Sequence, residues 1–216
     1  MAVLNDEQVM LRDMAREWTD NESPVASFRK MRDARGDKGF DAAAWTTQAE
    51  MGWAGIVIPE EFGGSAFGFL SLGLVLEQLG RNLAATPLAA SAVAASTIAL
   101  GSDERAKAEW LSKLASGEIV AALAVDEGPV HDPARFATGV ADGRLTGKKA
   151  FVAEGDAAAL FVVAAQDGLY LVADGEGIAR TTRHMADSRS HADITFTNAH
   201  ATRIGGTDLT AKAIDR

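Results

Sequence analysis

The hydrophobic pattern of this chain changes its period near Gly117, and this change limits the folds that the chain can adopt. Before Gly117, apolar residues recur at helical spacing, as they do from Leu11 to Trp18. After it, they form short runs or alternate with polar residues, as in residues 192–196. Side chains repeat every 3.6 residues in a helix and every two in a strand. The sequence therefore predicts an α+β chain, with a helical half followed by a β half.

The first half contains several signals for helix starts. Asn5 and Gln8 have the spacing of a capping box, in which each side chain bonds the backbone N–H of the other residue. Ser102 is expected to cap the last helix of this half. The charged and irregular residues 25–38 predict a loop, whereas residues 69–79, apolar almost all round, predict a buried helix. Further helices are predicted at residues 40–51 and 87–100.

The second half reads as a set of short strands. The Gln-Asp-Gly sequence that follows residues 160–165 indicates a β-hairpin, and Thr146-Gly147 predicts a turn. Residues 207–215 have the pattern of one more capped helix. Strands are predicted at residues 119–125, 144–153, 160–165, 169–172 and 192–197.

The composition excludes several classes of protein. The net charge of −9 over 216 residues argues against a nucleic-acid-binding protein, because phosphate binding needs a basic face. The absence of cysteine rules out disulfides and thiolate metal sites, and it fits a cytoplasmic location. The four histidines lack metal-ligand spacing, so no metal is expected. Residues 86–100, the most apolar long stretch, are too few to span a bilayer, so no membrane insertion is expected.

The first half also contains a loop with a distinctive sequence. Residues 51–64 read MGWAGIVIPEEFGG, and residues 76–81 read LEQLGR. An apolar run stops at Pro59, two carboxylates follow, and Gly63 and Gly64 close the turn. These strings resemble the N-terminal helical domain of the acyl-CoA dehydrogenases, where G-x-x-G-I-x-x-P-E-E-x-G-G is followed by E-x-L-G-R. A helical half before a β half also matches that family, so the resemblance covers nearly the whole chain.

The resemblance implies a division into three segments. Residues 1–117 correspond to an N-terminal all-helical domain, and residues 118–206 correspond to a small middle β-barrel domain. Residues 207–216 correspond to the start of a truncated C-terminal helix. The C-terminal helical bundle of the family is expected to be absent from this chain.

The resemblance implies FAD as the cofactor and two stretches that contact it. In residues 124–132, which match A-x-T/S-E-P-x-x-G-S-D, Asp126 replaces the hydroxyl residue. In residues 145–154, which match L-x-G-x-K-x-W-I-T-N, Phe151 keeps the aromatic wall and Ala153 loses a hydroxyl. On the residues alone, the first stretch also fits a strand end in a polar loop, and Phe151 fits a barrel core. The expected cofactor-binding residues are Leu123, Val125, Asp126, His131, Asp132, Phe151 and Ala153.

The same resemblance implies α,β-dehydrogenation of an acyl-CoA thioester with hydride transfer to FAD. The catalytic base of the family lies in its C-terminal bundle, so the catalytic residues of this chain are unknown. Asp187-Ser188-Arg189 resembles the family's D-x-T-R, which makes Arg189 either a phosphate ligand or a surface arginine. An acyl-CoA substrate and a homo- or hetero-oligomer are the expected partners.

Two other functions fit the same fold. The first is a non-catalytic partner subunit of a heteromeric acyl-CoA dehydrogenase. Such a subunit would tolerate Asp126, Ala153 and the replacement of the family proline by Gly128. The second is a flavin-dependent monooxygenase, because a fold does not fix a function.

Overall fold

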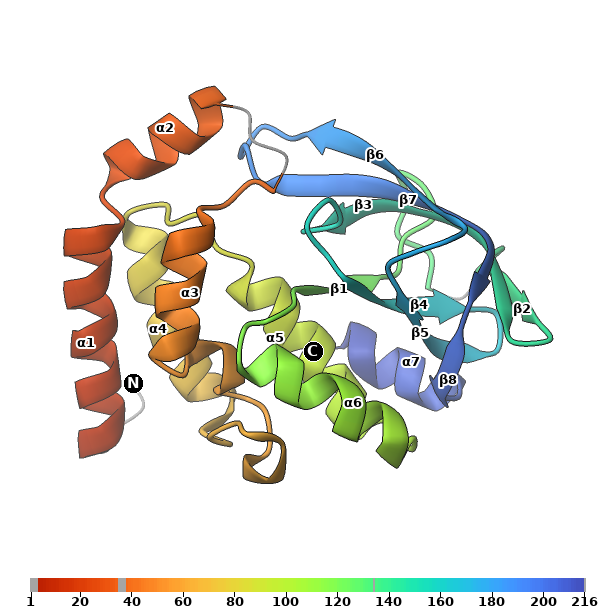
Figure 1. Ribbon diagram of the computed structural model, residues 1–216, viewed down its shortest axis with the longest axis horizontal. Helices are drawn as coiled ribbons and strands as arrows, with labels where there is room; N and C mark the ends of the chain where they lie inside the picture. The colour runs from red at the N-terminus through yellow and green to blue at the C-terminus, as the bar shows by residue number, and fades with distance from the viewer. Residues whose placement is uncertain (1–3, 35–37, 134, 216) are drawn as a thin grey trace.

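The computed structural model describes residues 4–34, 38–133 and 135–215 of the chain (Figure 1). Its first part, called the helical part, contains α1 (Asp6–Glu22), α2 (Val25–Ala34), α3 (Ala42–Glu50), η1 (Trp53–Gly55), η2 (Glu60–Phe62), α4 (Gly68–Arg81), α5 (Leu88–Leu100) and α6 (Glu104–Ala115). Its second part, called the β part, contains β1 (Ala121–Ala124), β2 (Gly139–Ala141), β3 (Arg144–Ala153), β4 (Leu160–Ala165), β5 (Gly168–Ala173), β6 (Ile178–His184), β7 (Ser190–His200) and β8 (Thr202–Gly205). Helix α7 (Thr207–Ile214) follows the strands. This order confirms the expected α+β class.

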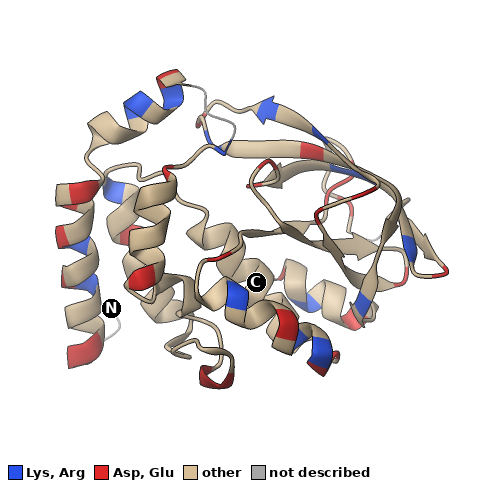
Figure 2. Ribbon diagram, viewed as in Figure 1, with Lys and Arg blue, Asp and Glu red and all other residues tan. Residues whose placement is uncertain are grey.

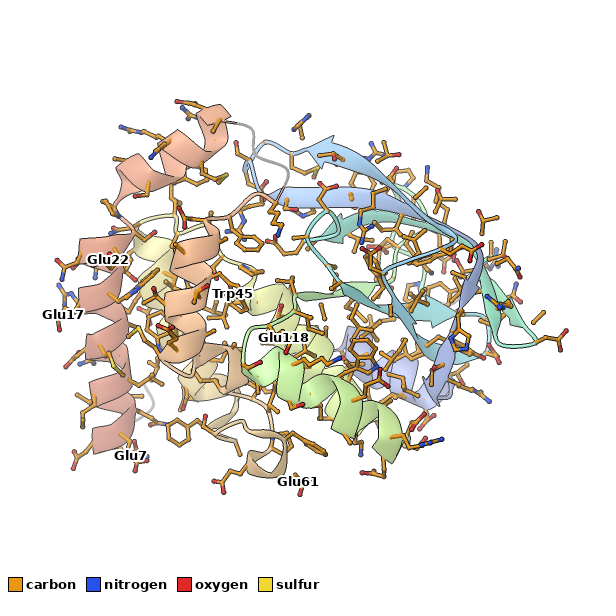
Figure 3. All side chains as sticks on the ribbon, in the orientation of Figure 1. Glu7, Glu17, Glu22, Trp45, Glu61 and Glu118 are labelled. Atoms are coloured by element: carbon orange, nitrogen blue, oxygen red, sulfur yellow. The ribbon has the colours of Figure 1, made fainter. Side chains whose placement is uncertain are left out.

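Tryptophans hold the helical part together. Trp18 of α1 packs edge to face on Trp53 of η1, with the ring centroids 5.5 Å apart. Aromatic pairs in this geometry stabilise a fold by more than the burial of their surface area alone. Trp45 of α3 donates its indole N–H to the carbonyl of Gly117 over 2.9 Å. Figure 3 shows Trp45 on the side of α3 that faces the rest of the molecule. This bond ties the helical part to the chain just before β1.

The caps of α1 and α6 confirm one prediction and correct another. The N–H of Gln8 donates to Asn5 over 2.8 Å, and the N–H of Asn5 donates to Gln8 over 3.1 Å, as expected for a capping box. At α6 the cap is Asp103, which accepts from the N–H of Ala106 over 3.1 Å. Ser102 was the wrong choice, because its hydroxyl donates to a carbonyl of β8 instead.

Helix α2 replaces the loop that the sequence predicts for residues 25–38. Val25, Phe28 and Met31 recur every three residues and are half-buried, while the charged side chains between them are exposed. Three apolar residues at this spacing form one helical face, and the charged neighbours form the other. The prediction was wrong because the many charges hid this short period; residues 35–37 lie outside the described residues.

The loop of residues 51–64 closes on itself at its two glycines. Gly63 adopts a φ of 83°, which glycine reaches without steric cost. A Cβ added to Gly64 would lie only 2.0 Å from the carbonyl oxygen of Ile58. The local backbone geometry therefore explains why glycine occupies both positions. Glu60 and Glu61 are exposed on this loop, and Figure 3 shows Glu61 at the outer edge of the molecule.

The β part consists of two four-stranded sheets (Figure 1). The first has the order β1-β4-β5-β8 and the second has the order β2-β3-β7-β6. Strands β1 and β4 are parallel, and the remaining pairs are antiparallel. The predicted hairpin is confirmed, because Ala165 of β4 pairs with Gly168 of β5.

The first sheet is the middle one of three layers. Every residue of β4 is buried, which is typical of a strand covered on both faces. Val162 belongs to the core shared with α5, α6 and α7. Phe161 and Val163 belong to the core between the two sheets, where Phe161 meets Phe196 of β7 with ring centroids 5.8 Å apart. The sheet thereby joins the helices to the second sheet.

Strand β3 runs through Thr146-Gly147, where the sequence predicts a turn. The pairing of β3 with β7 shifts register between Leu145 and Gly147, so these residues form an irregularity within a strand. A Cβ on Gly147 would lie 2.4 Å from the hydroxyl oxygen of Thr138. Glycine at this position reflects the close approach of a neighbouring segment.

Helix α4 is less buried than predicted. Leu72, Val75 and Leu79 are buried, but Phe69 and Leu70 at its start are 46% and 49% exposed.

Among the described residues, none of the helices combines the length and the hydropathy that a membrane span requires. Figure 2 shows acidic residues along α1 with basic residues between them, and acidic residues on the η2 loop at the bottom of the view.

Candidate functional site

Six of the seven expected cofactor residues line one cavity of about 290 Å³. The cavity lies where the end of β1 and the end of β3 meet α5 and α7. Asp132 is the exception, since it is not among the residues that line this cavity. The six are Leu123, Val125, Asp126, His131, Phe151 and Ala153. Residues separated by almost 30 positions in the sequence therefore meet at one place.

The cavity has largely apolar walls and one polar corner. Val93 of α5 and Ile214 of α7 complete the walls, and the sequence analysis missed both. No local motif marks them, because only the packing of three distant elements brings them together. At the polar corner, Oδ1 of Asp126 lies 2.6 Å from Nδ1 of His131. A carboxylate paired with an imidazole thus lies where the resemblance predicts a hydroxyl.

The side chain of Lys149 fixes the end of β1. Lys149 is fully buried, and its Nζ lies 2.9 Å from the carbonyl oxygen of Val125 and 2.9 Å from Oε1 of Glu127. The next residue, Ala150, donates its backbone N–H to the carbonyl of Asp126 over 2.7 Å. Three consecutive residues after β1 are therefore bonded to β3. The sequence analysis did not single out Lys149, although it occupies the lysine position of L-x-G-x-K.

Glu127 is the counter-charge of Lys149. It accepts backbone N–H groups from Ala137 over 2.6 Å and from Thr138 over 2.9 Å. Burial would raise the pKa of Glu127, but hydrogen bonds from Thr138, Lys149 and the backbone lower this pKa to about 2. Burial also lowers the pKa of Lys149, and Glu127 opposes that change. The carboxylate therefore stays charged at neutral pH and orders the loop around it.

Phe151 is held in a strained backbone conformation at the cavity wall. Its φ is 54°, which bulky residues rarely adopt and which often occurs at functional sites. Asp193 of β7 accepts the N–H of Phe151 over 3.2 Å. Arg183 of β6 lies over the ring, 4.7 Å from its centroid, and bonds Asp193 over 2.9 and 2.6 Å. The pKa of Asp193 is lowered to about 2, chiefly by the hydrogen bond from Arg183. The Asp193 carboxylate that holds the N–H of Phe151 is therefore ionised at neutral pH.

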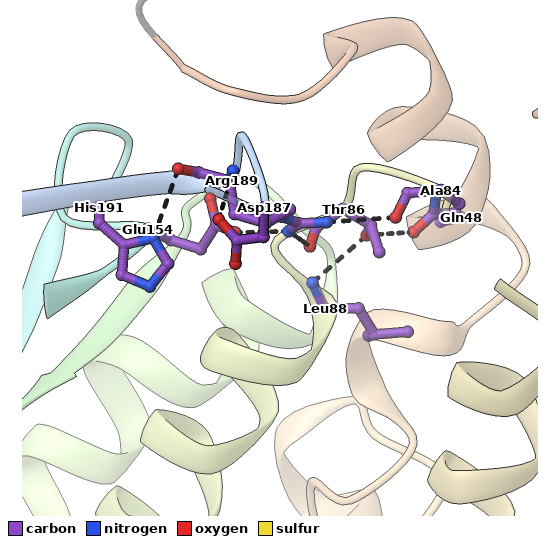
Figure 4. A network of polar contacts seen from close by, with 8 residues as sticks. All are labelled: Gln48, Ala84, Thr86, Leu88, Glu154, Asp187, Arg189 and His191. Atoms are coloured by element: carbon purple, nitrogen blue, oxygen red, sulfur yellow. Dashed lines mark hydrogen bonds and ion pairs between the residues drawn. The ribbon is translucent and has the colours of Figure 1, made fainter. Parts of the chain in front are cut away.

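Arg189 is already engaged within the protein. Its guanidinium bonds the carbonyls of Ala84 and Thr86 and the carboxylate of Glu154 (Figure 4). It is neither an uncommitted phosphate ligand nor an isolated surface arginine. It joins the segment between α4 and α5 to the segment that follows β3.

Among the described residues, no group of three or more His, Asp or Glu side chains is arranged to hold a metal ion.

Comparison with known proteins identifies a family and several relatives of this chain. Residues 5–118 match the family described as "Acyl-CoA dehydrogenase, N-terminal domain". The chain is 38% identical to (2S)-methylsuccinyl-CoA dehydrogenase of Cereibacter sphaeroides over 120 residues, which cover 54% of this chain and 21% of that protein. It is 31% identical to acyl-CoA dehydrogenase IpdE2 of Mycobacterium tuberculosis over 144 residues, which cover 65% of this chain and 44% of that protein.

Solved structures match nearly the whole of the described fold. The ChsE4-ChsE5 complex from Mycobacterium tuberculosis gives a TM-score of 0.87 at 26% identity and covers 99% of this chain and 61% of that chain. An acyl-CoA dehydrogenase from Bacillus anthracis complexed with FAD gives a TM-score of 0.82 at 21% identity. This match covers 98% of this chain and 41% of that chain. The chain thus spans well under two thirds of the length of these relatives.

Proposed function

Since this chain belongs to the acyl-CoA dehydrogenase family, we propose that it forms the helical and β portions of a flavoprotein that dehydrogenates an acyl-CoA thioester, with FAD as the cofactor. The observation that carries this proposal is the cavity at the ends of β1 and β3. Six of the residues expected from the family pattern converge there. We retain residues 1–117, 118–206 and 207–216 as the proposed domain boundaries.

The cavity fits part of a flavin better than it fits a whole dinucleotide. Its volume of about 290 Å³ is at the lower end of the range for small-molecule sites, roughly 300–1,000 Å³. Apolar side chains and the Phe151 ring suit a flat aromatic group. The donor set suits it less well, because Asp126 and Ala153 replace two hydroxyl residues of the family pattern. The fit is therefore good in shape and incomplete in hydrogen bonding.

The residues of this chain would bind and orient the cofactor rather than carry out the proton transfer. When bound, FAD supplies the two-electron acceptor for hydride removal from the acyl chain. Phe151 would form an apolar wall beside the ring, and the Lys149–Glu127 pair keeps the end of β1 in place. The family's carboxylate base lies in its C-terminal bundle, so we assign no residue of this chain to that role.

A non-catalytic partner subunit is the second candidate function. Asp126 favours it, because a carboxylate beside a flavin edge would repel the negative charge of the reduced ring. Its pairing with His131 at 2.6 Å weakens this argument, since an imidazolium would offset the charge. One structural relative is described as a complex of two chains, ChsE4 and ChsE5.

We propose association with a further protein surface, either a second copy of this chain or an unlike subunit. The large apolar side chains of Phe67 and Leu70 are each 49% exposed at the start of α4, and Met10 of α1 is 69% exposed. Phe67 and Leu70 lie three residues apart, and neighbouring exposed apolar side chains often mark contact surfaces.

The 216-residue chain should bind FAD only weakly. Two hydroxyl donors are missing, and each lost hydrogen bond in a closed site costs about 1 kcal/mol. We therefore expect the purified chain to carry far less than one FAD per molecule, and to quench FAD fluorescence only at high protein concentration. Absorbance of the purified protein and a fluorescence titration measure both properties. Saturable weak binding supports the flavoprotein, whereas no binding at any concentration supports the non-catalytic partner.

A further inference from the structure

Glu154 is a buried carboxylate for which the proposed flavin site has no use. It directly follows Ala153, the last wall residue of the cavity, and its side chain is only 4% exposed. Its backbone has a φ of 57°, a strained value for a residue with a long side chain. Oε1 lies 2.6 Å from Arg189, but Oε2 is buried without a hydrogen-bond partner among the described residues. A buried charged oxygen without a partner is costly.

Arg189 connects Glu154 to the helical part (Figure 4). Its guanidinium donates to the carbonyl of Ala84 over 3.2 Å and to that of Thr86 over 2.5 Å. The hydroxyl of Thr86 in turn accepts the N–H of Leu88, the first residue of α5, over 3.3 Å. Helix α5 carries Val93, a wall residue of the cavity. The contacts therefore run from one wall of the cavity to the helix that carries the opposite wall.

We propose that Glu154 and Arg189 form a proton-sensitive clamp that holds the end of β3 against the start of α5 and so sets the shape of the cavity. With a proton on Glu154, the clamp is closed. When Glu154 is ionised, its unpartnered oxygen draws the side chain toward water, and the clamp loosens. This proposal concerns the joint alone and does not depend on the identity of the ligand.

The groups around Glu154 determine the direction of the effect. Burial raises the pKa of Glu154 to about 7, Arg189 lowers it, and Asp187 and Asp156 raise it further. On the helical side, the carbonyl of Ala84 and the side chains of Gln48 and Thr86 are neutral, whereas Arg32 and Asp33 of α2 line a hollow together with Arg189. His191 of β7 contacts the Arg189 carbonyl (Figure 4).

The sign of the pH effect follows from that pKa. Because the pKa in the closed clamp is higher than the ordinary value of 4.5, the closed form binds the proton more tightly than an open, solvated form. The closed form is therefore fully favoured at low pH, and this advantage is lost as the pH rises through about 7.

The other contacts between the helical part and the β part confine the motion to the end of β3. Trp45 bonds the Gly117 carbonyl, and the N–H of Ala121 in β1 donates to the hydroxyl of Ser91 in α5 over 3.3 Å. Neither contact contains a titratable group, so both are expected to persist while Glu154 titrates. The clamp thus changes one wall of the cavity while the other remains in place.

Amide hydrogen exchange tests the clamp in the intact chain. The N–H of Glu154 bonds the carbonyl of Ser190 over 2.7 Å, and that of Gly155 bonds Val152 over 3.1 Å, so both amides report opening. After correction for intrinsic exchange, the opening equilibrium constant of both amides should increase about tenfold from pH 6 to pH 8. This follows because the pKa of Glu154 is about 7 in the closed form and takes the ordinary value of 4.5 in the open form. Glu154→Gln should abolish this increase, whereas the exposed-site control Glu61→Gln should keep it.

Titration of the Glu154 carboxyl carbon by NMR in the unmodified chain provides an independent measurement. A midpoint near 7 together with the tenfold change supports the clamp. A midpoint near the ordinary 4.5 overturns the proposal. Exchange of Glu154 and Gly155 that does not vary with pH also overturns it, whatever the midpoint.

Discussion

Replacing Lys149 with alanine should lower the free energy of unfolding by about 3 kcal/mol, because it breaks a buried ion pair on one side only. The carboxylate of Glu127 is 20% exposed and would lose its counter-charge. It keeps the N–H bonds from Ala137 and Thr138, which places the loss at the lower end of the usual range. The contact of the ammonium with the Phe136 ring, 4.4 Å from its centroid, is lost as well. Urea denaturation followed by circular dichroism measures the difference.

The neighbouring lysine offers a matched control. Lys148 is 57% exposed and lies 3.4 Å from Asp193, so Lys148→Ala should change stability by less than about 1 kcal/mol. Replacing both partners, as in Glu127→Gln with Lys149→Met, should recover part of the loss, since no buried charge remains. If Lys149→Ala and Lys148→Ala cost the same, the buried pair does not hold the end of β1.

The double variant Asp126→Thr with Ala153→Thr should bind FAD about tenfold more tightly than the parent chain. It removes one negative charge and restores two hydroxyl groups at the cavity. The ring of oxidised FAD is neutral, so the gain comes from the two restored hydrogen bonds, each worth about 0.5–1.5 kcal/mol. Fluorescence titration with FAD measures the two dissociation constants.

Asp132→Thr is the control for this variant. It removes the same charge six residues further along the same loop, at a position that does not line the cavity. Its affinity for FAD should stay close to that of the parent. Equal affinities for the double variant and the parent would show that positions 126 and 153 do not face the cofactor.

Local signals predicted most of the elements. The capping box of α1, the hairpin of β4 and β5, and the change of period near Gly117 depend on residues close in sequence, and each is present in the structure. Helix α2 was missed because its three apolar residues are outnumbered by charges. The turn at Thr146-Gly147 was wrong because glycine there accommodates Thr138, a contact that no local pattern encodes.

The family pattern reached the residues that line the cavity on β1 and β3, whereas no sequence signal marked the other lining residues. Six expected residues meet at the cavity, because both stretches end next to each other on β1 and β3. Val93 and Ile214 come from helices whose packing decides their place, so no motif marks them. Arg189 was noticed for its charge, but only the fold shows that buried Glu154 and two carbonyls hold it.

We expect the cavity at the ends of β1 and β3 to contact the flavin. The most direct test is to titrate FAD into the isotope-labelled 216-residue chain and map the amide chemical-shift changes, because this method detects weak binding. We expect the changes to cluster at residues 123–126, at His131 and at residues 150–153. Changes confined to other surfaces, or no changes at saturating FAD, would contradict the claim.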